Sequence, residues 1–169
     1  MIEEEIARII MQNAVKGSKI LEIGFGTGSI SLKLAKKGYI IHGIDSSKYA
    51  ITSSRAQARL KGLSDKVFFN TSKAESLDFP NKFFDLIYLV KTLHETKAVE
   101  ALREIHRVLK KGGKILIIDW IQGAKTWIHE QYFKPEKLEE MIAQEGFKRI
   151  KLEVIGEQML LLAKKYNGF

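Results

Sequence analysis

The stretch Ile20-Leu21-Glu22-Ile23-Gly24-Phe25-Gly26-Thr27-Gly28-Ser29 joins an apolar run to three closely spaced glycines. The apolar run predicts a β-strand, and the apolar spacing of residues 30–37 predicts a helix after the glycines. Glycine suits such a turn because backbone at positive φ is unstrained only without a Cβ, and because bare backbone lets a ligand approach. The first amides of the following helix direct partial positive charge at that ligand. The stretch therefore predicts a strand–turn–helix unit that binds a nucleotide-like cofactor.

The composition predicts one globular domain over residues 1–169. Of the residues, 45% are hydrophobic and 28% are charged, which is ordinary for a soluble protein. The chain has no run long enough to span a bilayer, and its acidic start lacks the basic region of a secretory signal. With no cysteine there is no disulfide framework, thiolate metal site or cysteine nucleophile, and the four histidines lack ligand spacing. We therefore predict a cytoplasmic protein without a metal.

The net charge of +8 and the pI near 9.5 fit an anionic partner such as RNA. A lysine-rich surface that keeps the protein soluble explains the same numbers. The longest basic runs are pairs, such as Lys36-Lys37 and Lys164-Lys165, and no arginine cluster is interleaved with aromatic residues. RNA is therefore a secondary candidate partner.

Helical and strand patterns alternate along the chain. Helices are predicted at residues 2–16 (within an N-terminal segment, 1–17), 30–37, 48–61, 99–109 and 135–145, and strands at 19–23, 39–44, 67–69, 85–90, 114–120, 150–155 and 159–163. Residues 110–113 break a helix, residues 70–82 form a loop, and residues 121–134 are irregular. This alternation predicts an α/β fold with a doubly wound, seven-stranded, mostly parallel sheet. Residues 147–165 form a terminal antiparallel hairpin, with 150–155 as the edge strand and 159–163 inside.

Taken in order, these motifs resemble the class I S-adenosylmethionine-dependent methyltransferases. The resemblance is carried by residues 21–29, 43–45, 73–77, 84–87 and 102–117, and it extends over about residues 18–165. It is greatest to the small-molecule branch around the ubiquinone/menaquinone C-methyltransferases. It implies the Rossmann-like methyltransferase fold and S-adenosylmethionine as the cofactor.

The resemblance also implies the cofactor-binding residues. They are Glu22, Gly24, Phe25, Gly26, Gly28, Asp45, Ser46, Ala74, Glu75, Val90 and Lys91. Asp45 would accept hydrogen bonds from both ribose hydroxyls, since a carboxylate with two oxygens matches a vicinal diol. Lys73 departs from the family, which usually has aspartate there to contact the adenine amino group. Lysine cannot accept that hydrogen bond.

The acceptor side is less specified by the sequence. His94 follows the fourth predicted strand, where it would accept a proton, orient the acceptor, or serve as a plain loop residue. Asp119 ends the fifth strand as a pocket residue or a structural acid. Trp120 ends the same strand, where ligand crevices form in such sheets, and is a further candidate acceptor residue. Bulky rings at Trp127, His129, Tyr132 and Phe133 predict either a flap over the acceptor pocket or a cover for the sheet.

A nicotinamide dinucleotide is disfavoured as the cofactor. Ser29 stands where the dinucleotide fingerprint needs glycine or alanine, and Glu22 suits the methionine ammonium better than a pyrophosphate. The sequence therefore predicts methyl transfer to an O, N or C atom, foremost on a small molecule, by a monomer or homodimer. The alternatives are an RNA methyltransferase, a non-catalytic S-adenosylmethionine-binding regulatory module, and an NAD-type oxidoreductase.

Overall fold

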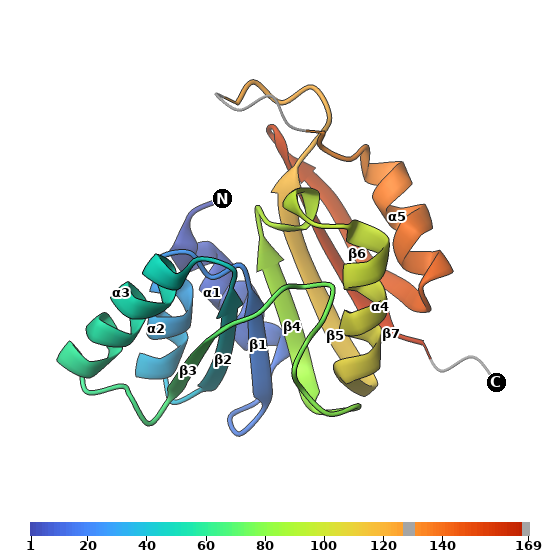
Figure 1. The fold of residues 1–169 in the computed structure, drawn as a ribbon. Helices are drawn as coiled ribbons and strands as arrows, with labels where there is room; N and C mark the ends of the chain where they lie inside the picture. Colours follow the sequence, from blue (N-terminus) through green and yellow to red (C-terminus); the bar gives the residue numbers. More distant parts are fainter. Residues whose placement is uncertain (127–130, 167–169) are drawn as a thin grey trace.

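The computed structural model describes residues 1–126 and 131–166, which form a single seven-stranded sheet with helices on both faces (Figure 1). The strand order is β3-β2-β1-β4-β5-β7-β6, and only β7 runs antiparallel to its neighbours β5 and β6. The strands are β1 (Lys19–Ile23), β2 (Ile40–Asp45), β3 (Val67–Thr71), β4 (Phe84–Val90), β5 (Leu109–Trp120), β6 (Phe147–Ile155) and β7 (Gln158–Lys165). The predicted fold class is confirmed, with β6 at the edge and β7 inside.

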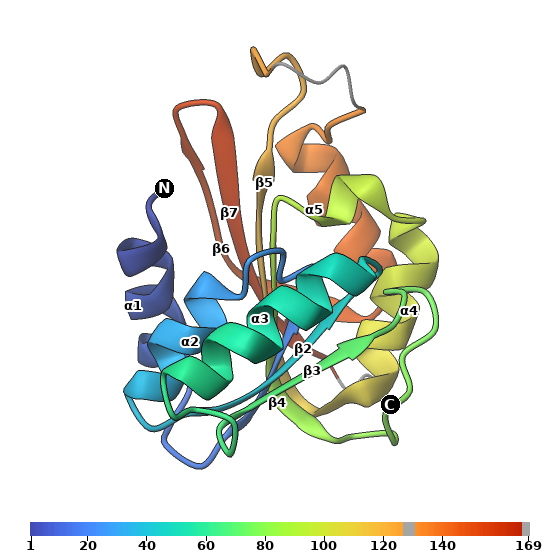
Figure 2. The ribbon, with the colours of Figure 1, turned by 60° about the vertical axis from the view of Figure 1, so that its left-hand side comes forward.

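Helices cover the two faces of the sheet in separate groups (Figure 2). Apolar residues of α1 (Glu3–Asn13), α2 (Ser29–Lys36) and α3 (Lys48–Leu60) pack on one face. Those of α4 (Ala98–Val108) and α5 (Pro135–Gln144) pack on the other, where a short 3₁₀ helix, η1 (Leu93–Glu95), also lies. Because both faces are covered, the apolar runs of the central strands β1 and β4 are buried on both sides.

β5 begins earlier than the sequence pattern indicates. Residues 110–113 were expected to break the preceding helix, but the strand already pairs at Leu109 with Phe84 and resumes its register at Lys114 with Leu86. The extra residues form a bulge, in which Gly112 has φ of 71°. A Cβ on Gly113 would lie 2.9 Å from Leu109 Cδ2, so glycine at this position lets the bulged backbone pack against Leu109 before the strand continues.

The loop after β3 covers the sheet with aromatic rings. Phe79 and Phe83 pack edge-on against Phe84, with ring centroids 4.8 Å and 4.9 Å apart, and all three rings surround His42 of β2. The sequence pattern predicts only a loop over residues 70–82, but Phe79 and Phe83 also pack against the core on the face that α4 and α5 cover. Among the described residues, no helix is both long enough and apolar enough to cross a bilayer.

Candidate cofactor and acceptor site

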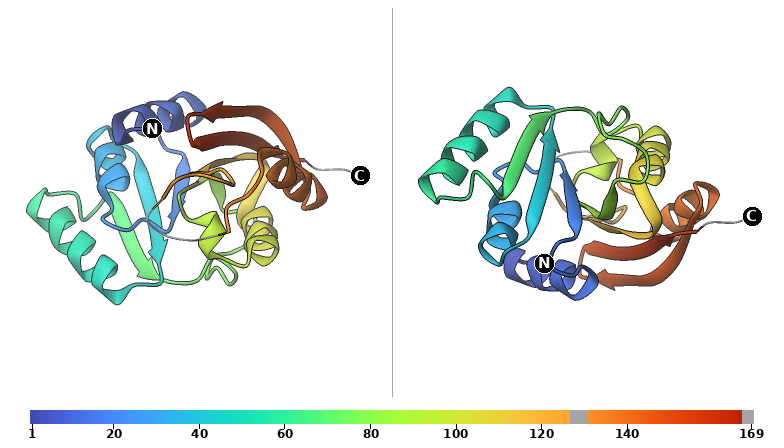
Figure 3. Two further views of the ribbon diagram at one scale, coloured as in Figure 1. Left: turned by 90° about the horizontal axis from the view of Figure 1, so that it is seen from above. Right: turned by 90° about the horizontal axis from the view of Figure 1, so that it is seen from below.

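A pocket of about 510 Å³ opens at the carboxyl ends of β1, β2 and β4. β1 lies between β2 and β4 in the sheet, which Figure 3 (left) shows from the end at which the parallel strands finish. The pocket therefore sits where the strand order reverses, the usual ligand crevice of doubly wound sheets. Most of the predicted cofactor residues come together in its wall. They are Gly24, Gly26, Asp45, Ser46, Ala74, Glu75, Val90 and Lys91.

The glycine turn is held closely against the end of β4. Gly24 has φ of 72°, its N–H donates to Ile44 O at 2.8 Å, and an added Cβ would lie 2.4 Å from Thr92 Cγ2. Gly26 differs, because it also has positive φ (54°) but a Cβ there would meet no atom within 4 Å. Gly24 is therefore required for packing, whereas Gly26 leaves open space beside the pocket.

Asp45 connects the glycine turn to the next helix. Its Oδ2 accepts from the Gly26 N–H and its Oδ1 from the Ser47 N–H, both at 2.9 Å. Ser47 in turn caps α3 by accepting from the Ala50 N–H at 3.2 Å. Each carboxylate oxygen has a second lone-pair site, so Asp45 can still accept from a diol in the pocket.

Glu22, Phe25 and Gly28 support the turn from behind and do not line the pocket. Glu22 is 3% exposed, because strand alternation turns its side chain toward α2. Tyr88 Oη donates to Glu22 Oε2 at 2.8 Å, Ser31 Oγ donates to the same oxygen, and burial raises the pKa of Glu22 to about 7. Phe25 packs on the ring of Phe69 with centroids 4.4 Å apart, while Gly28 is the N-cap of α2.

The segment after β3 forms another wall of the pocket. Ser72 and Lys73 both line the pocket there. Ser72 Oγ donates to Ser76 O at 3.0 Å and so stabilises the turn that holds Lys73 and Ala74. Glu75 Oε1 accepts from the Lys97 N–H at 2.8 Å, which ties this wall to the start of α4.

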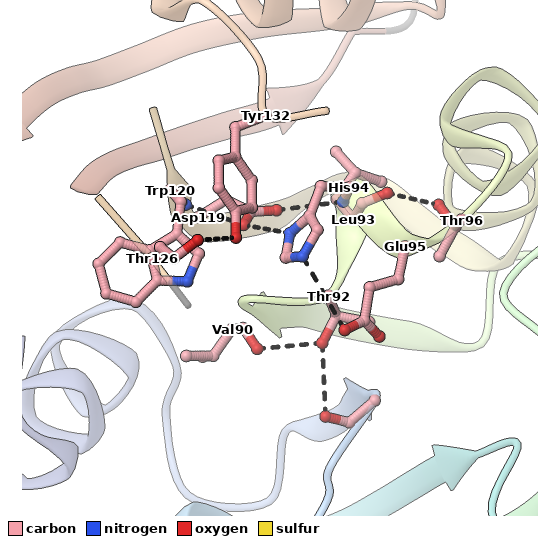
Figure 4. Close-up of polar contacts among 11 residues, drawn as sticks. Val90, Thr92, Leu93, His94, Glu95, Thr96, Asp119, Trp120, Thr126 and Tyr132 are labelled. Atoms are coloured by element: carbon pink, nitrogen blue, oxygen red, sulfur yellow. Dashed lines mark hydrogen bonds and ion pairs between the residues drawn. The ribbon is translucent and has the colours of Figure 1, made fainter. Parts of the chain in front are cut away.

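His94 and Asp119 form a close pair beside the pocket (Figure 4). His94 Nδ1 lies 2.6 Å from Asp119 Oδ1, and the fully buried Asp119 also accepts from the Trp120 N–H at 2.8 Å and the His94 N–H at 3.2 Å. His94 Nε2 lies 3.9 Å from Oε1 of Glu95, which lines the pocket. The carboxylate thus fixes the imidazole, and its other nitrogen is turned toward the pocket wall.

Aromatic rings surround this pair. The Tyr132 ring meets the His94 ring edge-on at 4.8 Å, and Tyr132 Oη is hydrogen-bonded to Thr126 Oγ1 at 2.8 Å (Figure 4). Lys91 Nζ lies 4.5 Å from the centroid of the Trp120 ring, with its backbone at a positive φ of 53°. Trp127 and His129, which were expected in the same flap, lie outside the described residues.

The sequence pattern did not identify Thr92 as a pocket residue, whereas Glu95 was expected beside His94 at the pocket and does line it. Thr92 follows Val90 and Lys91 at the end of β4, so the signal was its position and not its residue type. In the described part of the chain, His, Asp and Glu side chains form no group of three or more that could hold a metal ion.

Comparison with known proteins agrees with this geometry. The family described as "Methyltransferase domain" matches residues 21–117, from β1 through the glycine turn to the middle of β5. The chain belongs to this family, within the class I S-adenosylmethionine-dependent methyltransferases. The predicted resemblance is therefore confirmed, and family membership implies use of S-adenosylmethionine.

Two relatives illustrate the branch. "Methyltransferase GfsG" of Streptomyces halstedii is 32% identical over 105 residues, which are 61% of this chain and 38% of the relative. "Ubiquinone/menaquinone biosynthesis C-methyltransferase UbiE" of Yersinia pestis is 29% identical over 141 residues, 78% of this chain and 56% of the relative. The chain thus spans less than two thirds of the length of either relative.

Solved structures share the whole fold. A SAM-dependent methyltransferase from Methanosarcina mazei aligns with a TM-score of 0.83 and 23% identity, covering 94% of this chain and 97% of that one. The [4+2]-cyclase SpnF aligns with a TM-score of 0.89 and 23% identity over 98% of this chain and 81% of that one. At such identity the likeness concerns the fold alone, and one of these two proteins is named as a cyclase.

Proposed function

We propose that this protein transfers a methyl group from S-adenosylmethionine to an O or C atom of a small molecule. The observation that best supports this function is the position of Asp45 at the carboxyl end of β2. Its carboxylate is hydrogen-bonded to the glycine turn and lines a pocket of about 510 Å³. That volume lies within the range of about 300–1,000 Å³ that small-molecule and cofactor sites occupy. Family membership and the two methyltransferase relatives support the same reaction.

The residues in the pocket fit S-adenosylmethionine. Asp45 offers acceptor oxygens for a ribose diol, and the space next to Gly26 allows a ligand to approach the backbone. Lys73 in the wall after β3 makes the adenine end less specific than in the family pattern. When bound, the cofactor supplies an electrophilic methyl group on sulfur, and the protein contributes positioning and exclusion of water.

His94 is the proposed proton acceptor, and Asp119 is its positioning residue. We assign the imidazole hydrogen to Nδ1, which faces Asp119 Oδ1 at 2.6 Å, and the lone pair of the neutral ring to Nε2. Nε2 is directed toward Glu95 in the pocket wall. A proton acceptor is needed when a hydroxyl or an acidic carbon is methylated, because the nucleophile must then lose a proton. This favours O or C acceptors over amines.

The first experiment is calorimetric titration of the protein with S-adenosylmethionine, S-adenosylhomocysteine and NAD. Micromolar binding of the first two, without binding of NAD, is the expected result. Absence of binding to the first two would refute the proposal and reduce the relationship to one of fold. Accumulation of S-adenosylhomocysteine with an extract of small metabolites then distinguishes a methyltransferase from a regulatory binding module.

Two further parts of the proposal rest on sequence alone. RNA is the alternative acceptor, for which the net charge of +8 is the general argument. The cytoplasm is the proposed location, since a chain without cysteine is suited to a reducing compartment and needs no disulfides.

A further inference from the structure

Lysine side chains form a row across the sheet at the end opposite the cofactor pocket. Lys164 of β7 pairs directly with Lys114 of β5 and with Lys148 of β6. Directly paired residues of antiparallel strands point to the same face, and neighbouring strands are about 4.8 Å apart, so the row is about 10 Å wide. Like charges directly opposite each other destabilise a sheet. The row is therefore unfavourable for the fold by itself.

A groove of about 560 Å³ runs beside this row. It is lined by Lys111, Lys148, Arg149, Lys164, Lys165 and Tyr166, and none of its lining residues is acidic. Two irregularities meet here, the bulge at residues 110–113 of β5 and the register shift of β6 between Arg149 and Lys151. A Cβ on Gly112 would lie 3.1 Å from Lys164 Cε, so the glycine leaves room for the lysine stem.

Three of these cations have no carboxylate partner among the described residues. Arg149 Nη1 is paired with Glu139 Oε1 at 2.9 Å, and Lys165 Nζ donates to the carbonyl oxygens of Leu109 and His106. By contrast, no carboxylate within residues 1–126 and 131–166 forms an ion pair with Lys111, Lys148 or Lys164. The groove thus presents concentrated and unneutralised positive charge.

We propose that this groove binds a single-stranded segment of nucleic acid. Lys111, Lys148 and Lys164 would contact successive phosphates, and the Tyr166 ring, which is 53% exposed, would stack on a base. Cationic grooves with exposed aromatic rings bind single strands in this way, with little dependence on sequence. An anionic membrane fits less well, because a bilayer cannot follow a concave groove. The exposed Val154 and Ile155, moreover, lie at the other end of β6.

The groove is remote from the methyl-transfer site. Lys111 and Gly112 of the groove lie near the amino end of β5, whereas the cofactor pocket opens at the carboxyl ends of the parallel strands. Bound nucleic acid and bound cofactor therefore occupy opposite ends of the sheet. Binding of nucleic acid in the groove does not depend on the proposed reaction.

The test is fluorescence anisotropy with a labelled oligouridylate of about 12 nucleotides, which matches the span of such sites. Affinity should fall as salt rises from about 50 mM to about 200 mM, with a slope of log K against log salt of about −2, since three contacts to a single strand each contribute about −0.7. Absence of binding at the lowest salt would overturn the proposal. So would a slope near zero.

A charge reversal separates the binding role from any structural role. Lys164→Glu places a carboxylate between Lys114 and Lys148, so it should raise the melting temperature while it weakens oligouridylate binding about tenfold. Lys61→Glu, at the exposed end of α3, makes the same change in net charge and should leave binding within about twofold. Equal weakening by both variants would mean that only net charge matters, and the groove would be rejected.

Two additional measurements complete the design. Lys148→Gln removes one cation from the exposed edge strand and should weaken binding even if the reversal at residue 164 disturbs the fold. Vesicles containing anionic phosphatidylserine test the membrane alternative. Vesicle binding that Lys164→Glu abolishes, together with no binding of oligouridylate, would overturn the nucleic-acid proposal.

Discussion

Replacing Glu22 by glutamine should remove most of a pH dependence of stability. Glu22 is buried, and its Oε2 accepts from the hydroxyls of Ser31 and Tyr88. Burial is the main cause that raises its pKa from 4.5 to about 7, while the two hydroxyl donors oppose the shift. The folded protein therefore holds a proton between about pH 5 and pH 7 that the unfolded chain has lost.

The sign and size of the effect follow from this difference. Stability is greatest below the unfolded pKa of 4.5 and declines as the pH rises toward the folded value of about 7, above which it levels off. The gap between the two pKa values corresponds to about 3 kcal/mol, since one pKa unit is worth about 1.4 kcal/mol. Glutamine keeps the shape and an acceptor oxygen for both hydroxyls but carries no charge at any pH.

The assay is urea unfolding of wild type and Glu22→Gln at intervals from about pH 5 to about pH 8.5. The free energy of unfolding of the variant, relative to that of wild type, should rise by about 3 kcal/mol across this pH range, because only wild type loses stability through Glu22. The difference in unfolding free energy between the two proteins does not contain the contributions of His42 and His106, because burial lowers the pKa values of both histidines in wild type and variant alike. Glu5→Gln, at an exposed position of α1, is the matched control and should give a flat difference. Parallel stability curves for wild type and Glu22→Gln would refute the reasoning.

Four other substitutions test the site. Asp45→Ala should weaken S-adenosylmethionine about ten- to a hundredfold in calorimetry, the equivalent of about 1.5–3 kcal/mol for a charge-assisted hydrogen bond, and unchanged affinity would contradict the ribose assignment. Gly24→Val should lower the melting temperature more than Gly26→Val, since only a Cβ at residue 24 collides with Thr92. Gly26→Val should chiefly abolish cofactor binding. Equal melting temperatures of the two variants would contradict this distinction. His94→Ala should lower turnover at least about a hundredfold while cofactor affinity is retained, and intact turnover would exclude His94 as the proton acceptor.

The parts of the fold that could be predicted from the sequence are those set by local residues. The limits of β1 and the start of α3 agree with the sequence because glycines and the serine cap at Ser47 act locally. The bulge at residues 110–113 depends on the partner strand β4, which pairs with Leu109, so no local signal reveals that the strand has already begun. The aromatic cover around His42 likewise depends on contacts between distant segments.

The site was predictable to a similar degree. Asp45 and the glycine turn were found because their positions in the chain match a family pattern and a chemical need. The orientation of Glu22 was missed, since the family role placed it by the methionine, whereas strand alternation directs its side chain away from the pocket wall. The pairing of His94 with Asp119 joins two segments through adjacent strands, and a single sequence contains no sign of that distance.

The position of β1 between β2 and β4 has a consequence for the order of folding. β4 follows α2, β2, α3 and β3 in the chain, so its pairing with β1 is non-local and closes late. Val90 and Lys91 at the end of β4 complete the pocket, and a nascent chain that ends at β3 therefore lacks more than half of the lining residues. During synthesis from the amino terminus the cofactor has no site on the emerging β1–α2–β2 segment. The cofactor can therefore stabilise the complete sheet, but it cannot assist the folding of the β1–α2–β2 segment while that segment is being synthesised.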